Sequence, residues 1–135
     1  MVNKNKVKGS AWEKDFADLI EKNVKGSKAK RVPASGAMGT HMNEPLLQGD
    51  VKAMLPGLNK DMRVECKVGY GGNTQITIQK EWIDKIVSEA ENSYSYPALA
   101  CKFLGARKSE GVQYFIILDL DTFFDIINYI GSLSK

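Results

Sequence analysis

The sequence predicts a single domain of the α/β (α+β) class, built on a central mixed β-sheet flanked by helices. Three observations lead to this prediction. The chain has 135 residues, which is enough for one hydrophobic core. Its composition, 43% hydrophobic and 26% charged, excludes a disordered chain, a collagen-like repeat and a disulfide-stapled miniprotein. Apolar residues recur with helical or strand periods in the order αβββαββα, which indicates a mixed sheet. Residues 1–135 are therefore expected to form one domain.

The N-terminal third predicts an arm, a helix, a short strand and a loop. Residues 1–9 are expected to form a basic arm before a helix that opens at Ser10 and ends near Asn23. Apolar residues of this helix recur at helical spacing: Trp12, Phe16, Leu19 and Ile20. A short strand is expected over residues 31–33. Residues 36–48 have no clear period and contain glycines and a proline, so they are predicted to form a mobile surface loop.

The rest of the chain predicts a hairpin, two helices and two further strands. Residues 50–55 and 62–68 alternate around a Pro-Gly turn, which is typical of a β-hairpin. The later patterns follow one another along the chain: a helix over 78–92, strands over 98–104 and 112–118, and a last helix capped by Asp121. The apolar surplus of the last helix is assigned to the core or, in part, to a subunit interface.

The distribution of charge indicates an anionic partner more clearly than the total does. The formal net charge is only +3. Residues 1–31 carry nine basic and four acidic side chains, so this segment has a net charge of +5 and the remaining 104 residues have −2. A positive field concentrated at one end of the chain suits a protein that binds phosphate groups.

Cysteine content and hydropathy indicate where the protein works. Cys66 and Cys101 lie in apolar, strand-like surroundings, which is typical of buried free thiols in a reducing compartment. No signal peptide is expected at the basic N-terminus. The longest apolar run, residues 114–118, is too short to span a bilayer. The sequence therefore predicts a cytoplasmic protein without membrane contact.

The candidate active site combines Asp50 with the tripeptide Glu65-Cys66-Lys67. Residues two apart in a strand share a face, so Glu65 and Lys67 are expected to project together while Cys66 enters the core. If the hairpin turn is centred near residue 58, Asp50 lies opposite position 66, within one residue. Two carboxylates and one amine are therefore expected to converge.

This set of groups suits metal-assisted phosphodiester hydrolysis. Mg²⁺ and Mn²⁺ prefer hard oxygen ligands and bind through one or two carboxylates plus a phosphate. Such a cation lowers the pKa of a bound water, and a neighbouring lysine orients that water or neutralises developing charge. The predicted cofactor is Mg²⁺, with Mn²⁺ as a substitute.

The same residues resemble the signature of the PD-(D/E)xK nuclease superfamily, with Gly49 where its eponymous proline would stand. Two further segments are similar to archaeal-type Holliday junction resolvases. Residues 8–13, Lys-Gly-Ser-Ala-Trp-Glu, resemble the start of their first helix, and residues 31–36 resemble their Arg-x-x-x-Ser-Gly segment. The resemblance implies a restriction-endonuclease-like core and structure-selective cleavage of four-way DNA junctions.

The resemblance also implies a role for each residue of the site. Asp50, Glu65 and Glu13 would hold the metal together with the backbone carbonyl of Cys66. Glu13 would complete the site from the first helix, and Lys67 would assist the nucleophilic water.

DNA is the partner that the resemblance implies, with Ser35 touching the scissile phosphate. The other expected DNA contacts are basic and amide side chains of the first helix, the first strand and the start of the second helix: Lys6, Lys8, Lys14, Arg31, Gln79 and Lys80. Two symmetric nicks in a junction need two sites, and a chain of this size holds one. A homodimer is therefore expected.

Structural alternatives remain open for individual residues and for the function. Residues 10–13 also match a capping box, in which Glu13 bonds back to the amide of Ser10. Glu65 and Lys67 also fit a solvated strand face. The alternative functions are another PD-(D/E)xK DNA endonuclease, acting in repair, nicking or replication, and a non-catalytic nucleic-acid-binding domain.

Overall fold

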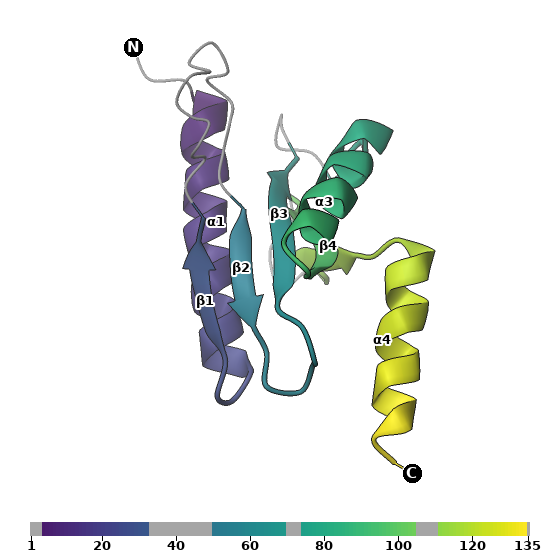
Figure 1. Cartoon of the computed structure of the whole chain (residues 1–135). Coiled ribbons are helices and arrows are strands. Elements are labelled where there is room, and N and C mark those ends of the chain that lie inside the picture. Colours follow the sequence, from purple (N-terminus) through teal and green to yellow (C-terminus); the bar gives the residue numbers. More distant parts are fainter. Residues whose placement is uncertain (1–3, 33–49, 70–73, 105–110, 135) are drawn as a thin grey trace.

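The computed structural model describes residues 4–32, 50–69, 74–104 and 111–134 (Figure 1). The predicted loop over 36–48, and with it Ser35 and Gly49, lies outside the described residues. Within the described residues, three helices and five strands follow one another in the expected order αβββαββα: α1 (Lys4–Asn23), β1 (Lys28–Arg31), β2 (Val51–Met54), β3 (Met62–Val68), α3 (Lys80–Asn92), β4 (Tyr96–Lys102), β5 (Tyr114–Ile117) and α4 (Leu120–Ser132).

The five strands form one mixed sheet in the order β1-β2-β3-β4-β5. The pairs β1–β2, β2–β3 and β4–β5 are antiparallel, whereas β3–β4 is parallel. Parallel neighbours need a crossover connection, and α3 provides it. The chain thus forms an α+β domain with a restriction-endonuclease-like arrangement, as the sequence predicts.

The two faces of the sheet are covered by different helices. On one face, Trp12 and Phe16 of α1 pack on a cluster of strand residues: Val51, Val64, Cys66, Val68, Ala98 and Ala100. The indole Nε1 of Trp12 donates a hydrogen bond of 2.9 Å to the carbonyl oxygen of Ala100. On the other face, Leu99 and Cys101 of β4 pack on Ile86 of α3. Along β3, the side chains that point away from α1 therefore face α3.

The first helix begins six residues earlier than the sequence pattern predicts. α1 starts at Lys4, so residues 4–9 belong to a helix rather than to an arm. Lysine is a good helix former, and these residues continue the helix without a break. Ser10 consequently lies inside α1 and is not its N-cap, so the alternative of a capping box with Glu13 is wrong.

Several other boundaries shift by a few residues. β1 covers 28–31 instead of 31–33, because it pairs with β2 from Lys28 onward. α3 begins at Lys80 rather than at 78, since Gln79 has an extended backbone and forms the N-cap. β4 and β5 cover 96–102 and 114–117 in place of 98–104 and 112–118.

The cap of the last helix is Asp119 and not Asp121. The Asp119 carboxylate accepts hydrogen bonds from the amide and the hydroxyl of Thr122, at 3.2 and 2.6 Å. Asp121 lies in the first turn instead, where a negative charge is favoured by the helix dipole.

None of the helices among the described residues is long and apolar enough to cross a membrane.

Candidate active site

The β2–β3 hairpin brings Asp50 to Glu65. Val51 pairs with Val64 in this hairpin, so one step further along the antiparallel register Asp50 lies opposite Glu65. The predicted partner was position 66, within one residue, and the observed register satisfies that prediction. Both carboxyl-bearing residues are buried, with 5% and 6% of their surface exposed.

Strand alternation separates Cys66 from its two neighbours. The side chain of Cys66 is buried among the strand residues that pack on α1. Burial raises the pKa of its thiol, so the group stays neutral. Glu65 and Lys67 project to the opposite face, where Lys67 Nζ lies 2.9 Å from Glu65 Oε2. The ammonium also lies 4.5 Å from the centre of the Trp82 ring of α3, which is within the range of a cation–π interaction.

Helix α3 contributes a third carboxylate that sequence reasoning missed, Glu89. One carboxylate oxygen from each of Asp50, Glu65 and Glu89 lies within 4.8 Å of the other two. We call these three residues the acidic cluster. Glu89 follows Trp82 and Ile86 on the helical stripe that faces the sheet. A carboxylate on an otherwise apolar stripe was the signal that could have identified it.

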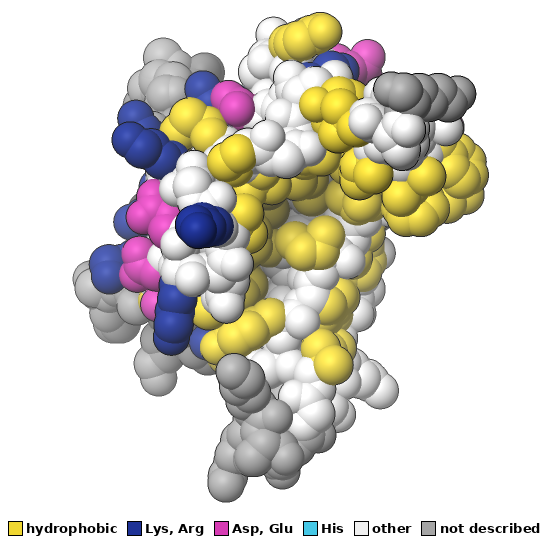
Figure 2. All heavy atoms as spheres, turned by 90° about the horizontal axis from the view of Figure 1, so that it is seen from below, with side chains coloured by type: hydrophobic (Ala, Val, Ile, Leu, Met, Phe, Trp, Pro, Cys, Tyr) yellow, Lys and Arg dark blue, Asp and Glu magenta, His cyan; other side chains and the backbone are white. Residues whose placement is uncertain are grey.

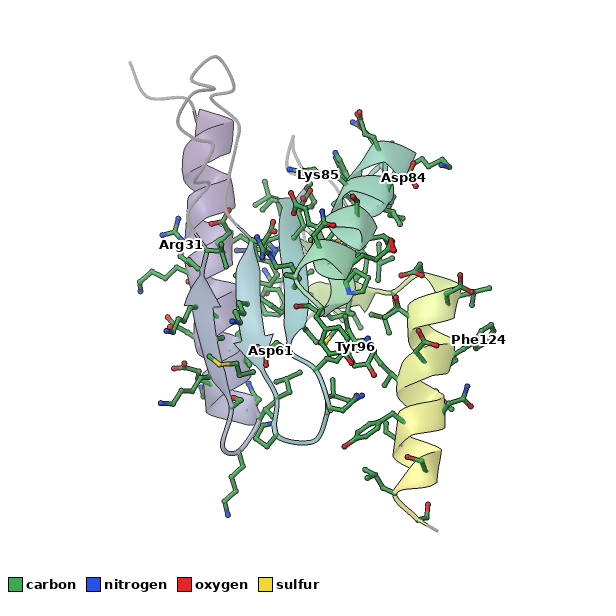
Figure 3. All side chains as sticks on the ribbon, viewed as in Figure 1. Arg31, Asp61, Asp84, Lys85, Tyr96 and Phe124 are labelled. Atoms are coloured by element: carbon green, nitrogen blue, oxygen red, sulfur yellow. The ribbon has the colours of Figure 1, made fainter. Side chains whose placement is uncertain are left out.

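Three basic side chains contact the acidic cluster. Arg63 Nε donates a hydrogen bond of 2.9 Å to Asp50 Oδ2, and Lys67 pairs with Glu65 as described above. Lys85 Nζ lies 3.7 Å from Glu65 Oε1, and Figure 3 shows Lys85 extending from α3 in the region of β3. The cluster is therefore surrounded by positive charge that offsets part of its own repulsion.

Two buried oxygens of the cluster nevertheless have no hydrogen-bond partner, Glu65 Oε1 and Glu89 Oε1. Unpaired buried acceptors are uncommon in folded proteins because each costs about 1–3 kcal/mol. Burial, followed by a hydrogen bond with Asp50, raises the pKa of Glu89 to about 7. Hard carboxylate oxygens at this spacing, two of them unsatisfied, fit a divalent cation such as Mg²⁺ or Mn²⁺.

Glu13 lies near the acidic cluster without being part of it. The carboxylate is 1% exposed and accepts a hydrogen bond of 3.2 Å from Arg31 Nε. Burial raises the pKa of Glu13, while Arg31 lowers it and the charges of Asp50 and Glu65 raise it further. Its observed partner is thus Arg31 of β1 rather than the amide of Ser10.

The remaining predicted DNA contacts lie on the surface wherever they are described. Lys14 pairs with Asp18 at 3.6 Å, and Lys80 pairs with Asp84 at 2.7 Å. Both are exposed pairs, which contribute little to stability and leave the ammonium groups available. Gln79 is exposed at the start of α3. The Arg31 side chain is 48% exposed. The side chains of Lys6 and Lys8, like Ser35, are outside the described residues.

Comparison with known proteins gives one family match. Residues 4–127 match a family model described as "Phage putative PDDEXK endonuclease". The match covers all eight helices and strands except the last turns of α4. No curated protein matches the chain.

Proposed function

The chain belongs to this PDDEXK endonuclease family, and on that premise we propose that it is a divalent-metal-dependent DNA endonuclease that uses Mg²⁺, with Mn²⁺ as a substitute. The observation that supports the proposal most strongly is the acidic cluster next to Lys67. Its three carboxylates come from β3, from α3 and from the residue before β2, and their oxygens lie within 4.8 Å of one another. The PD-(D/E)xK signature alone would supply only two of them.

Asp50, Glu65 and Glu89 would hold the cation, together with the backbone carbonyl of Cys66. Bound there, a divalent cation lowers the pKa of a water and stabilises negative charge on the phosphate. The two oxygens without hydrogen-bond partners, Glu65 Oε1 and Glu89 Oε1, would serve as ligands, which would remove the cost of burying them unpaired.

Lys67 positions the attacking water and neutralises charge that develops on the phosphate. Its ammonium is fixed from two sides, by Glu65 at 2.9 Å and by the Trp82 ring at 4.5 Å. Glu13 and its partner Arg31 complete the site on the side of α1. Arg31 is half-exposed and has guanidinium donors left over for a phosphate oxygen.

DNA is bound through its backbone. The contacts that we assign to phosphate are Ser35 and the basic and amide side chains along α1, β1 and the start of α3: Lys6, Lys8, Lys14, Arg31, Gln79 and Lys80. Contacts of this kind add affinity without reading the sequence and weaken as salt increases. Recognition is therefore of DNA shape rather than of a base sequence.

The substrate that we propose is a four-way DNA junction, resolved by paired symmetric nicks in a homodimer. The resemblance of residues 8–13 and 31–36 to archaeal-type Holliday junction resolvases supports this finer assignment. The family description names a phage endonuclease. We accordingly place the protein in the cytoplasm of a phage-infected host.

A cleavage assay with three substrates tests the proposal. A synthetic four-way junction, its matched duplex and a matched single strand are incubated with the protein in Mg²⁺, in Ca²⁺ and in EDTA. We expect nicking of the junction in Mg²⁺ alone, with binding retained in Ca²⁺. Equal cutting of the duplex would refute the resolvase assignment and leave another endonuclease of this family.

Matched variants separate the metal site from general effects of charge. Asp50→Asn and Glu65→Gln are expected to abolish cleavage and keep DNA binding. Asp61→Asn removes a carboxylate that is 39% exposed in its side chain and pairs with Lys52, so it is expected to cleave normally. Full activity of Glu65→Gln would refute the site, and a protein inert in every metal would favour a non-catalytic binding domain.

A further inference from the structure

Helix α4 presents most of its large apolar side chains to solvent. On the inner side Thr122 is buried, and Ile126 and Tyr129 are half-buried. Asp119 and Asp125 line a cavity there with Tyr96. The outer side carries five large apolar residues that are 44–68% exposed: Leu120, Phe123, Phe124, Ile127 and Ile130. Figure 3 shows Phe124 pointing away from the body of the molecule. A helix in contact with water on its outer side normally shows the reverse arrangement.

The apolar surface continues onto the edge strand that precedes α4. β5 is the last strand of the sheet, and its residues Tyr114 and Ile116 are 39% and 50% exposed. We call these two residues and the five of α4 the α4–β5 surface. In Figure 2, hydrophobic side chains gather on the side where α4 lies, whereas charged side chains gather on the opposite side.

A hollow lies beside this surface. It has a volume of about 160 Å³ and is lined by apolar residues of α1 and β5, among them Phe16, Ile20, Tyr114 and Ile116. No helix or strand of the described chain packs extensively on α4. Only two residues separate β5 from α4, and the Asp119–Thr122 hydrogen bonds fix the direction in which α4 leaves the sheet. The five exposed apolar side chains of α4, which we call the α4 ridge, are thereby held on the outer side.

From these features we propose that a second copy of this chain covers the α4–β5 surface, in a two-fold symmetric dimer. A two-fold axis places the same surface on both partners, so the α4 ridge of each copy packs against the α4–β5 surface and hollow of the other. A ridge and a hollow on one continuous surface are what self-complementary packing requires.

The area agrees with what a stable dimer needs. Three of the seven side chains are aromatic, and a fully covered aromatic side chain buries about 150–250 Å². At about 150–200 Å² for each fully covered side chain, seven roughly half-exposed ones present roughly 500–700 Å² in total. The standard interface buries about 800 Å² on each partner, whereas the largest apolar patch of a typical monomer is about 300–600 Å². A second copy therefore accounts for the whole surface.

The dimer leaves both acidic clusters open. β5 and β3 lie on opposite sides of β4 in the sheet, so packing at the β5 edge does not cover the site between β2, β3 and α3. The two-fold axis then presents two sites to one DNA molecule. In assigning paired incisions to these two sites, the inference rests on the proposed nuclease function, whereas the dimer itself does not.

Sedimentation of the full chain without DNA or metal tests the dimer by itself. We expect the wild type to be a dimer at micromolar concentrations, and its Tm to rise by about 2–4 °C for each tenfold increase in protein concentration. Ile127→Asp is expected to weaken dimerisation at least about 100-fold, because two-fold symmetry buries the introduced charge twice. Phe124→Asp should act in the same way.

Tyr94→Asp is the matched control. Tyr94 is 74% exposed and lies outside the α4–β5 surface, and aspartate tolerates its positive φ of 54°. This variant is expected to remain a dimer. A monomeric wild type without concentration dependence of Tm would overturn the inference. So would dimers that persist in both α4 variants when circular dichroism shows them to be folded. A monomeric result would remove the paired nicks of a homodimer but would leave metal-dependent cleavage untouched, because DNA and metal are absent from this test. Failure to cleave, in turn, does not bear on the dimer.

Discussion

Replacing Glu89 by glutamine is expected to stabilise the metal-free protein at neutral pH and to weaken its response to metal. Burial and the hydrogen bond with Asp50 raise the pKa of Glu89 from 4.5 to about 7. Between these two pH values the folded state therefore binds more protons than the unfolded state does. The free energy of unfolding consequently falls as pH rises through this window.

The pKa difference sets the size of the effect. It corresponds to at most ~3 kcal/mol between pH 4 and pH 8, and because Glu89 and Asp50 share a hydrogen bond we expect about 1–2 kcal/mol. Glutamine keeps the shape and a hydrogen bond without the charge. Glu89→Gln should therefore raise Tm by about 3–8 °C at pH 8 and hardly change it at pH 4.

Addition of Mn²⁺ should reverse the order of stability. At a concentration 100 times its dissociation constant, a ligand of the folded state contributes about 2.7 kcal/mol. The wild type gains this with three carboxylates, while Glu89→Gln has two and should gain less. Thermal melts at pH 4 and pH 8, with and without Mn²⁺, measure both effects.

Glu91→Gln is the control, since Glu91 is exposed on the same helix. It should leave both Tm and the response to Mn²⁺ unchanged. A Glu89→Gln protein that is less stable than the wild type at pH 8, and that gains as much from Mn²⁺, would show that Glu89 is neither strained nor a ligand.

Three other predictions concern the groups around the cluster. Lys67→Met should lower the cleavage rate at least about 100-fold while keeping the Mn²⁺-induced rise in Tm; loss of that rise would make Lys67 part of the metal site instead. Trp82→Leu, which removes the ring 4.5 Å from the Lys67 ammonium, should lower kcat about 3- to 10-fold with little change in KM, and Trp82→Phe should recover most of it; an equal effect on KM would place Trp82 in substrate binding. Lys80→Gln should reduce the slope of log affinity for DNA against log salt by about 1 at an unchanged Tm, and an unaltered slope would remove Lys80 from the DNA interface.

The sequence predicted the parts of the site that follow from local rules. Strand alternation is sufficient to separate Cys66 from Glu65 and Lys67, and a short Pro-Gly turn limits the register enough to bring Asp50 opposite Glu65. Both arguments need only residues 50–68. The order of helices and strands followed from apolar periodicity for the same reason.

The parts that the sequence did not predict depend on distant contacts. Glu89 joins the site because the α3 crossover places that helix on the face of the sheet that carries Glu65, and helix periodicity alone does not say which face is covered. Glu13 was assigned two competing local roles, and its partner proved to be Arg31, 18 residues away. The predicted N-cap of α4 was wrong by two residues, because Asp119 and Asp121 both fit the pattern of a helix N-cap. Only the path of the chain after β5 decides between them.

The ion pairs around the site also bear on the stability of the metal-free protein. Asp50, Glu65 and Glu13 each have a cationic side chain within 3.2 Å, and Glu89, with a pKa of about 7, is half-protonated at neutral pH. Negative charge in the interior is thus balanced by the chain's own groups, unlike in small zinc domains, whose folding free energy comes from the metal. We therefore expect the apoprotein to be folded, and its Tm to be unchanged by a chelator. Under the proposed function, phosphates that draw Arg31 and Lys67 away from their carboxylates would raise the affinity for the cation. By thermodynamic reciprocity the cation would then raise the affinity for DNA by the same factor.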